Sequence, residues 1–417
     1  MNVKSLYEIF KKVRPILLFI AFTLFVIAWV MKYGAPGGQE NAAFWTGASY
    51  YLAISIIVIG MPISFKKNAI MLGLWMFYNL YEFILVLTGV HTQQVQEISI
   101  YLLDVGVYVL MAISLATYFS EKMDLLWLSV QLGLTVSLGC MAFLFHSELM
   151  TYIPDLLSGI FENSRVARVG IGFYNVNILG GLSGLLVFVS LVNIVRQNFR
   201  YSSIVTALFG GYLLLNSGTR SSMLALMATI LFCALIVVGH KYRYIYNRIL
   251  PGIFFAGELA YGLFMGTVNQ TSGLAKLVSS LTSERSILGS IAFDQLDSLV
   301  KLLFGTGMRI QGNIRENFFD YWPGYYGLDG EPQWFVFTTG IVGALVTLVI
   351  VTLSMYKISQ RSKSGFLFMV YFGTIMTFEH VFFNSQSVSA ASGILLTVIF
   401  VSLLADVNHI AVWRRKL

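Results

Sequence analysis

The sequence predicts an all-α fold, a polytopic bundle of membrane helices, and two observations lead to it. Apolar residues make up 57% of the 417 residues and charged residues only 11%, whereas soluble proteins carry roughly a quarter charged residues. Apolar runs recur along the chain at about the 20-residue length that crosses a hydrocarbon core as a helix. Backbone polar groups inside a bilayer must be bonded within the protein, which such runs achieve as helices. We therefore expect residues 1–417 to form a single integral membrane domain.

About twelve transmembrane helices can be placed in order. The first apolar run is long, lacks a small-residue cleavage site and is followed by further spans, so we expect it to be retained. The predicted spans are Arg14–Met31, Gly47–Ser64, Ala69–Val90, Ile98–Phe119, Leu125–Phe145, Gly172–Val195, Ser203–Asn216, Ser221–Val238, Ile249–Gly266, Trp334–Tyr356, Gly365–Phe383 and Ser387–Ala405.

The distribution of Lys and Arg orients these spans. With both termini in the cytoplasm, eighteen of the 27 basic residues fall in cytoplasmic segments and nine outside. This excess agrees with the rule that cytoplasmic loops are rich in Lys and Arg. The outer ones are Lys32, Arg165, Arg168, Arg220, Lys276, Arg285, Lys301, Arg309 and Arg315. Most of these are arginines, which bind phosphate through paired hydrogen bonds. The outer face is therefore suited to a phosphate or pyrophosphate, and the scattered basic residues give no reason to expect nucleic acid.

Residues 267–333 form the longest segment that is not simply apolar. It holds seven of the twenty carboxylates and five of the 27 basic residues. The predicted topology makes it one large extracytoplasmic loop, which we expect to act as a lid and as part of an active site. Apolar residues at helical spacing predict an amphipathic helix over Ser283–Phe304 that Gly305 ends. Arg285 falls on its apolar face, so it either has an anionic partner there or extends back to water.

Several stretches in and around this loop resemble one known family. Arg168-Val-Gly-Ile-Gly-Phe-Tyr-Asn-Val-Asn177 leads into a helix start with small residues, and Asn216-Ser-Gly-Thr-Arg220 joins two spans. Ser283-Glu-Arg285 is followed by Phe304-Gly-Thr-Gly307 and then by Gly340-Ile-Val-Gly343. Their order and common predicted side resemble the bacterial O-antigen polymerase and O-antigen ligase family over about residues 165–343.

The resemblance implies a metal-independent glycosyltransferase of the bacterial cytoplasmic membrane that works on the outer face. Its donor would be an undecaprenyl-pyrophosphate-linked oligosaccharide, with Arg168, Arg220 and Arg285 holding the pyrophosphate. Ligases have a His about eleven residues before the Gly-x-x-Gly, where this chain has Asp329. We therefore expect a polymerase that joins repeat units of an O-antigen, capsule or exopolysaccharide. Membrane lipids, a chain-length regulator and a flippase are the further partners.

Glycosyl transfer also needs a group that helps to deprotonate the acceptor hydroxyl. The expected catalytic base is Asp329 or Glu331, just before the tenth span, with Asp329 favoured by the family spacing. Further candidate site residues are Arg165, Asn177, Arg309, Arg315, Glu379 and His380. We expect no cofactor, because there is no Cys/His metal spacing, no Walker-type motif and no Asp-x-Asp.

Other interpretations stay open. Arg165 and Arg168 are also typical of contacts with lipid phosphates, and Arg220 is suited to capping the C-terminus of the seventh span. Glu82, Asp104 and Glu258 lie within spans, where an ionisable group usually marks a functional site. Rival functions are an O-antigen ligase-type transferase, a lipid-linked oligosaccharide flippase or transporter, and a non-catalytic scaffold for envelope enzymes.

Overall fold

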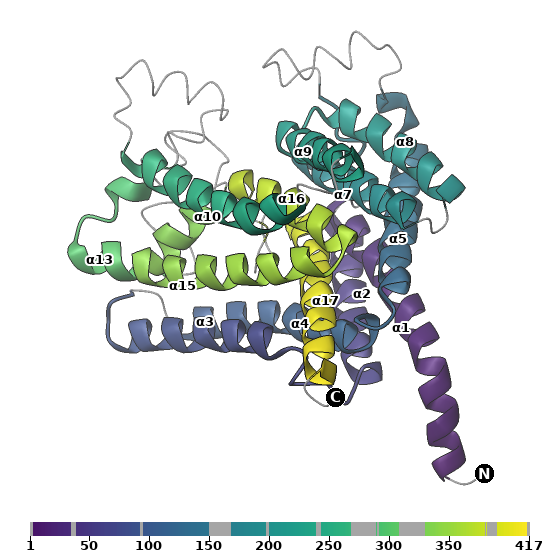
Figure 1. Cartoon of the computed structure of the whole chain (residues 1–417), viewed down its shortest axis with the longest axis horizontal. Helices are drawn as coiled ribbons and strands as arrows, with labels where there is room; N and C mark the ends of the chain where they lie inside the picture. Colours follow the sequence, from purple (N-terminus) through teal and green to yellow (C-terminus); the bar gives the residue numbers. More distant parts are fainter. Residues whose placement is uncertain are drawn as a thin grey trace.

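The structure, a computed structural model, confirms the all-α class, since every regular element among its described residues is helical (Figure 1). It describes residues 3–34, 39–91, 95–149, 168–196, 200–238, 243–267, 289, 292–307, 330–379, 381 and 390–414. The long helices are α1 (Val3–Gly34), α2 (Gln39–Ile59), α3 (Ala69–Leu87), α4 (Val95–Phe119), α5 (Met123–Leu144), α7 (Val176–Val195), α8 (Arg200–Ser217), α9 (Arg220–Val238), α10 (Arg243–Thr267), α15 (Glu331–Arg361), α16 (Lys363–Phe378) and α17 (Ala390–Arg414). Two short elements, η1 (His146–Glu148) and α13 (Leu299–Phe304), complete the set. Each predicted span thus coincides with one helix, although several ends differ.

Several helices are suited to a multi-pass membrane protein. Among the described residues, six are long and apolar enough to cross a membrane: α1, α2, α3, α5, α7 and α15. Large apolar side chains such as Leu87 and Phe143 are 75% and 79% exposed, and an apolar surface of this kind requires a cover such as lipid. The count of twelve spans and their sidedness stay predictions.

A core of aromatic side chains joins the two halves of the chain. Phe188 of α7 stacks on Tyr371 of α16 with ring centroids 4.4 Å apart, and Phe372 stacks on Phe400 of α17 at 5.9 Å. Trp29 of α1 is fully buried, and its indole donates to the Ala391 carbonyl at 3.0 Å. In Figure 1, α17 runs across α4 and α15. The packing of α17 therefore links the first helix to the last part of the chain.

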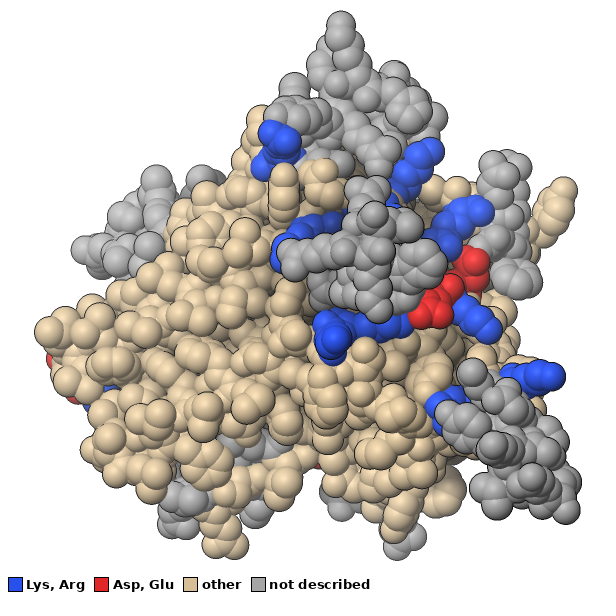
Figure 2. All heavy atoms as spheres, turned by 60° about the horizontal axis from the view of Figure 1, so that its bottom comes forward, with Lys and Arg blue, Asp and Glu red and all other residues tan. Residues whose placement is uncertain are grey.

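The helix ends that the charge pattern assigns to the cytoplasm contact one another. In the described part of the chain, three ion pairs of Lys or Arg join different helices or their connections: Lys67–Glu121 at 2.8 Å, Arg196–Asp124 at 2.7 Å and Arg361–Asp406 at 3.2 Å. Each pair joins two segments that are predicted to lie inside. Figure 2 shows Lys and Arg gathered in one part of the face in view, with Asp and Glu among them. These ion pairs thus join the helix ends that are predicted to lie inside.

A kink in α15 holds the segment that ends α13. Gly340 has φ 65° and ψ −176° inside α15, a conformation that only glycine adopts readily. The kink interrupts the helical bonding of the preceding turn, and two carbonyls of that turn accept hydrogen bonds from the other segment. The Thr306 amide donates to Phe337 at 3.0 Å, and the Gly307 amide donates to Thr338 at 2.9 Å. The motifs Phe304–Gly307 and Gly340–Gly343 are therefore two halves of one contact.

A buried pair from α3 and its following turn fixes this contact. His91 Nδ1 lies 3.1 Å from Glu82 Oε1, and both side chains are fully buried. His91 Nε2 lies 3.1 Å from the Phe304 carbonyl, so this nitrogen carries the proton that it donates. Tyr81 also donates to the Thr339 carbonyl at 2.6 Å. Glu82, an ionisable group within a predicted span, thus has a structural partner.

The prediction of one amphipathic helix over Ser283–Phe304 is wrong in the part that the structure describes. Residues 296–298 are not helical, and Ser298 is extended, with φ −130° and ψ 154°. Its side chain accepts from the Lys301 amide at 3.3 Å and so begins α13, as short polar residues at an N-cap do. Leu299, expected in the apolar stripe, is 70% exposed. Gly305 does end the helix, with φ 81°.

We predict that Gly340→Ala lowers the free energy of unfolding by about 2 kcal/mol or more, because alanine is strained at this φ and ψ. Its Cβ would also overlap the backbone of Leu303. Gly139→Ala in α5 is the matched control, since its Cβ would meet nothing within 4 Å and alanine favours a helix. Thermal unfolding in detergent measures the stability of both variants. Equal stability would contradict the close contact between Gly340 and the segment that ends α13.

Candidate functional site

The Arg168 guanidinium joins the ends of three helices. Its Nε donates to the carbonyl of Ser217, the last residue of α8, at 2.8 Å. Its Nη2 donates to Asn177 Oδ1 in the first turn of α7 at 2.7 Å and to Thr219 Oγ1 just before α9 at 3.3 Å. The Val169 amide also donates to the Asn216 carbonyl at 3.0 Å. Arg168 therefore fixes the segment before α7 against the turn between α8 and α9.

A tight turn carries the chain from Arg168 into α7. Ile171 is fully buried with φ 41°, a conformation that a β-branched residue adopts only under strain, and Gly172 follows with φ 77°. Asn175 then caps α7, because its Oδ1 accepts from the Asn177 amide at 2.8 Å. The cap occupies the Asn177 backbone and leaves the Asn177 side chain to bond Arg168. Backbone strain of this type is common at functional sites.

Small residues let α7 and the start of α9 approach closely. A Cβ at Gly180 would overlap the Thr219 side chain, and a Cβ at Gly184 would lie 2.9 Å from Ser222 Cβ. The two glycines are four residues apart, so they share one face of α7, as in small-xxx-small helix contacts in membranes. This approach brings Thr219 and Arg220 beside the first turn of α7.

The C-terminus of α16 adds a carboxylate to the cluster. Ser221 Oγ of α9 donates to Glu379 Oε1 at 2.8 Å, and Glu379 is only 8% exposed. α16 ends at Phe378, short of the Phe383 expected, because Glu379 is extended, with φ −131° and ψ 142°. The first residue after α16 therefore turns toward the residue next to Arg220.

Two further helix starts lie against this cluster. A Cβ at Gly330, just before α15, would lie 3.1 Å from the Thr377 carbonyl near the end of α16. A Cβ at Gly181 of α7 would lie 3.1 Å from Ser392 Oγ of α17. The ends of α7, α8, α9, α15, α16 and α17 that meet here are all ends that the charge pattern assigns to the outside. We call the group Arg168, Asn177, Ser217, Thr219, Arg220, Ser221 and Glu379 the arginine cluster.

The structure brings together four of the candidate site residues: Arg168, Asn177, Arg220 and Glu379. Glu331 is the first residue of α15, next to Gly330, so its backbone lies near the end of α16, and its side chain is outside the described part. The other candidates lie outside the described residues: Arg165, Arg285, Arg309, Arg315, Asp329 and His380.

The hydroxyl residues of the cluster were not predicted as site residues. Ser217, Thr219 and Ser221 flank Gly218, whose φ of 59° makes the turn between α8 and α9. Ser217 and Thr219 lie in the Asn216–Arg220 motif and Ser221 follows it, but the resemblance assigned a role only to Arg220 of that motif. Arg168 donates to the last carbonyl of α8, and Arg220 begins α9. Arg168 therefore caps the helix end at which Arg220 was considered as a cap.

The arrangement is suited to an anion. Two arginines lie at the N-termini of α7 and α9, where the aligned peptide dipoles place partial positive charge. Backbone amides at helix N-termini and guanidinium groups are the groups that bind phosphate oxygens in proteins. In the part of the chain that the structure describes, no three His, Cys, Asp or Glu side chains come together to hold a metal ion.

The fold and the cluster together define an all-α protein with membrane-type helices and a cationic site at their ends. Neither a scan against protein-family models nor a search of curated proteins finds a match to this chain. Function is therefore inferred from the chemistry of the arginine cluster.

We predict that Gly181→Cys combined with Ser392→Cys forms a disulfide under mild oxidation. The two Cβ positions would be 3.6 Å apart, within the usual range for a disulfide. Cys140 and Cys233 are first replaced by Ala, and free thiols are then counted by mass after maleimide labelling. The matched control pairs Gly181→Cys with Gly211→Cys, whose Cβ would meet nothing within 4 Å. Two reactive thiols in the Gly181/Ser392 pair would contradict the packing of α17 beside the cluster.

Proposed function

We propose that the protein is a polysaccharide polymerase that joins undecaprenyl-pyrophosphate-linked oligosaccharide repeat units on the outer face of the bacterial cytoplasmic membrane. One observation carries the proposal: Arg168 is bonded to Ser217, Asn177 and Thr219, beside Arg220 and Glu379. Segments from separate parts of the chain thus bring two arginines and one carboxylate to the same site. Glycosyl transfer from a diphosphate needs positive charge to stabilise the leaving group and a base to accept the proton of the acceptor hydroxyl.

The arginines would bind and stabilise the leaving diphosphate. Charge develops on that group as the glycosidic bond to it breaks, and fixed cations stabilise the developing charge without a metal. The bonds that Arg168 makes to α7, α8 and the start of α9 hold its guanidinium in place before substrate binds. Such preorganisation is the main source of electrostatic catalysis. Arg285, from the large loop, is proposed as a third cation.

A carboxylate would take the proton of the acceptor hydroxyl. Among the proposed bases, Glu379 is supported by its contact with Ser221, next to Arg220. Asp329 and Glu331 remain proposed on the family resemblance, and the position of Gly330 beside Thr377 supports a base from this segment as well. The hydroxyl oxygen would attack the anomeric carbon, its proton would pass to the carboxylate, and undecaprenyl diphosphate would leave. A direct displacement of this kind inverts the anomeric centre.

We predict that Arg168→Ala and Arg220→Ala each slow polymerisation by about a hundredfold or more, the usual effect of removing a preorganised charge from a transition state. The assay supplies purified protein in vesicles with lipid-pyrophosphate-linked oligosaccharide and resolves the product ladder by gel. Glu379→Gln should slow the same reaction by about a hundredfold, because general bases contribute that much or more. Glu331→Gln and Asp329→Asn are measured beside it.

Arg248→Ala is the matched control, because Arg248 is an exposed arginine near the predicted cytoplasmic end of α10. It should leave the ladder unchanged. A normal ladder from both Arg168→Ala and Arg220→Ala would remove the diphosphate assignment. Transfer of labelled lipid across the vesicle wall without any longer product would instead indicate a flippase.

A further inference from the structure

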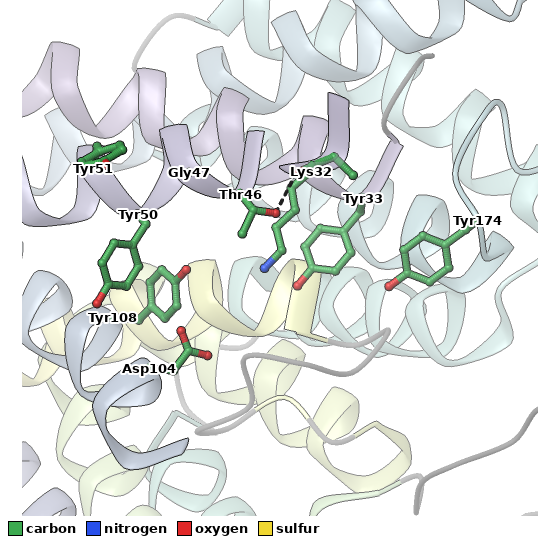
Figure 3. A pocket seen from close by; sticks show the side chains of 10 residues that line it. Lys32, Tyr33, Thr46, Gly47, Tyr50, Tyr51, Asp104, Tyr108 and Tyr174 are labelled. Carbon is green, nitrogen blue, oxygen red and sulfur yellow. Dashed lines mark hydrogen bonds between the residues drawn. The ribbon is translucent and has the colours of Figure 1, made fainter. Parts of the chain in front are cut away.

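A cavity lies at the ends of α1, α2 and α4 that are predicted to face outside. Its volume is about 600 Å³, within the range of small-molecule binding sites. Figure 3 shows Lys32 and Tyr33 reaching from α1 toward Asp104 and Tyr108 of α4. The remaining lining residues that bear polar groups are Thr46, Tyr50 and Tyr51 of α2 and Tyr174 before α7.

The walls combine flat aromatic rings with opposite charges. Tyr33 and Tyr108 are 5% and 4% exposed, and the Tyr33 hydroxyl makes no hydrogen bond to the described residues. A buried hydroxyl without a bond is costly, so a ligand that bonds it is favoured. The Lys32 ammonium lies over the Trp29 ring, 4.4 Å from its centroid, and is close enough to Asp104 for their charges to interact. The cavity thus offers a donor cation and an acceptor anion between rings.

These walls fit a sugar better than they fit a lipid. A pyranose presents C–H groups to aromatic rings and hydroxyls that both donate and accept, which matches tyrosines beside Lys and Asp. An acyl chain would remove water from Lys32 and Asp104 and would offer their charged groups no hydrogen bond, which is costly. A zwitterionic lipid headgroup would satisfy the two charges but would leave the tyrosine rings without a matching surface.

Tyr174 connects this cavity to the arginine cluster. Its ring lies 6.2 Å from the Tyr33 ring, and it belongs to the same short segment as Asn177, which bonds Arg168. Tyr174 and Asn177 are three positions apart in the sequence, so their Cα atoms lie no more than about 10 Å apart. A glycan seated against Tyr174 could therefore extend to a diphosphate at Arg168.

We propose that the cavity of Lys32, Tyr33, Asp104, Tyr108 and Tyr174 is a glycan-binding subsite that holds one or two sugar residues of the oligosaccharide. Its role as a substrate subsite of the polymerase rests on the proposed function; its capacity to bind a glycan does not. Of these residues, the sequence singled out Asp104, as an ionisable residue within a span, and Lys32, as a basic residue on the predicted outer face.

The test measures binding of the free oligosaccharide repeat unit, released by mild acid from the lipid-linked pool of the source cells. This probe carries no diphosphate, so its binding reports on the cavity and not on the arginine cluster. Saturation-transfer NMR and calorimetry should detect binding to the purified full-length protein. Asp104→Asn and Tyr174→Ala should each raise the dissociation constant about tenfold, the effect expected for one lost charged hydrogen bond or aromatic contact.

Asp124→Asn and Tyr201→Ala are the matched controls, since Asp124 is exposed at a helix end predicted to be cytoplasmic and Tyr201 is 87% exposed at the start of α8; both should bind like the wild type. Tyr174 is itself 67% exposed, so Tyr174→Ala leaves no hole in the core and tests the cavity even where Asp104→Asn fails to fold. Unchanged binding by a folded Tyr174→Ala variant would overturn the subsite.

Two further outcomes separate the proposals. Binding that Tyr174→Ala weakens, from a protein that makes no product ladder, would keep the subsite and reject the polymerase. Absence of glycan binding to the wild type, together with phosphatidylethanolamine that co-purifies with the wild type and is lost in Asp104→Asn, would assign the cavity to a lipid headgroup and overturn the subsite.

Discussion

The bonds from Arg168 to three helix ends are the constraint on which the site depends. A charged group beside an apolar bundle is stable only where polar partners surround it, and Ser217, Asn177 and Thr219 supply them. Two of these partners belong to the turn between α8 and α9, so the bonds that stabilise the arginine also bring Arg220 into place. The glycines of α7 allow the close approach, because a Cβ at Gly180 would overlap Thr219. Stability and ligand geometry thus come from the same contacts.

Among the described residues, polar contacts between helices are found at both sets of helix ends. One set carries the ion pairs Lys67–Glu121, Arg196–Asp124 and Arg361–Asp406, and the other carries the arginine cluster and the tyrosine-lined cavity. The contact at the kink of α15 has the same role for the large loop, because the amides of Thr306 and Gly307 donate to the carbonyls of Phe337 and Thr338. The part of the loop that follows Gly307 therefore begins from a fixed point.

The sequence predicted every long helix, since apolar runs of this length leave the backbone no other way to bond. It also predicted that Arg168, Asn177 and Arg220 belong to one site. It did not predict the kink, because Gly340 lies inside an apolar run and its conformation depends on amides supplied by Thr306 and Gly307. The break before α13 was missed because apolar spacing continues through it, while Ser298 caps a new helix. The cavity could not be predicted because its rings come from segments far apart in the sequence. Only the packing of the fold brings Tyr33, Tyr108 and Tyr174 together.

The most direct measurement of the central claim is native mass spectrometry of the protein with undecaprenyl pyrophosphate and undecaprenyl phosphate at equal concentration. Two arginines at two helix N-termini should prefer the diphosphate, because it offers more oxygens for paired guanidinium bonds. The wild type should retain mainly undecaprenyl pyrophosphate, and a protein with both Arg168→Gln and Arg220→Gln should lose that preference. Equal retention of the two lipids by the wild type, or the same preference in the double variant, would contradict the account.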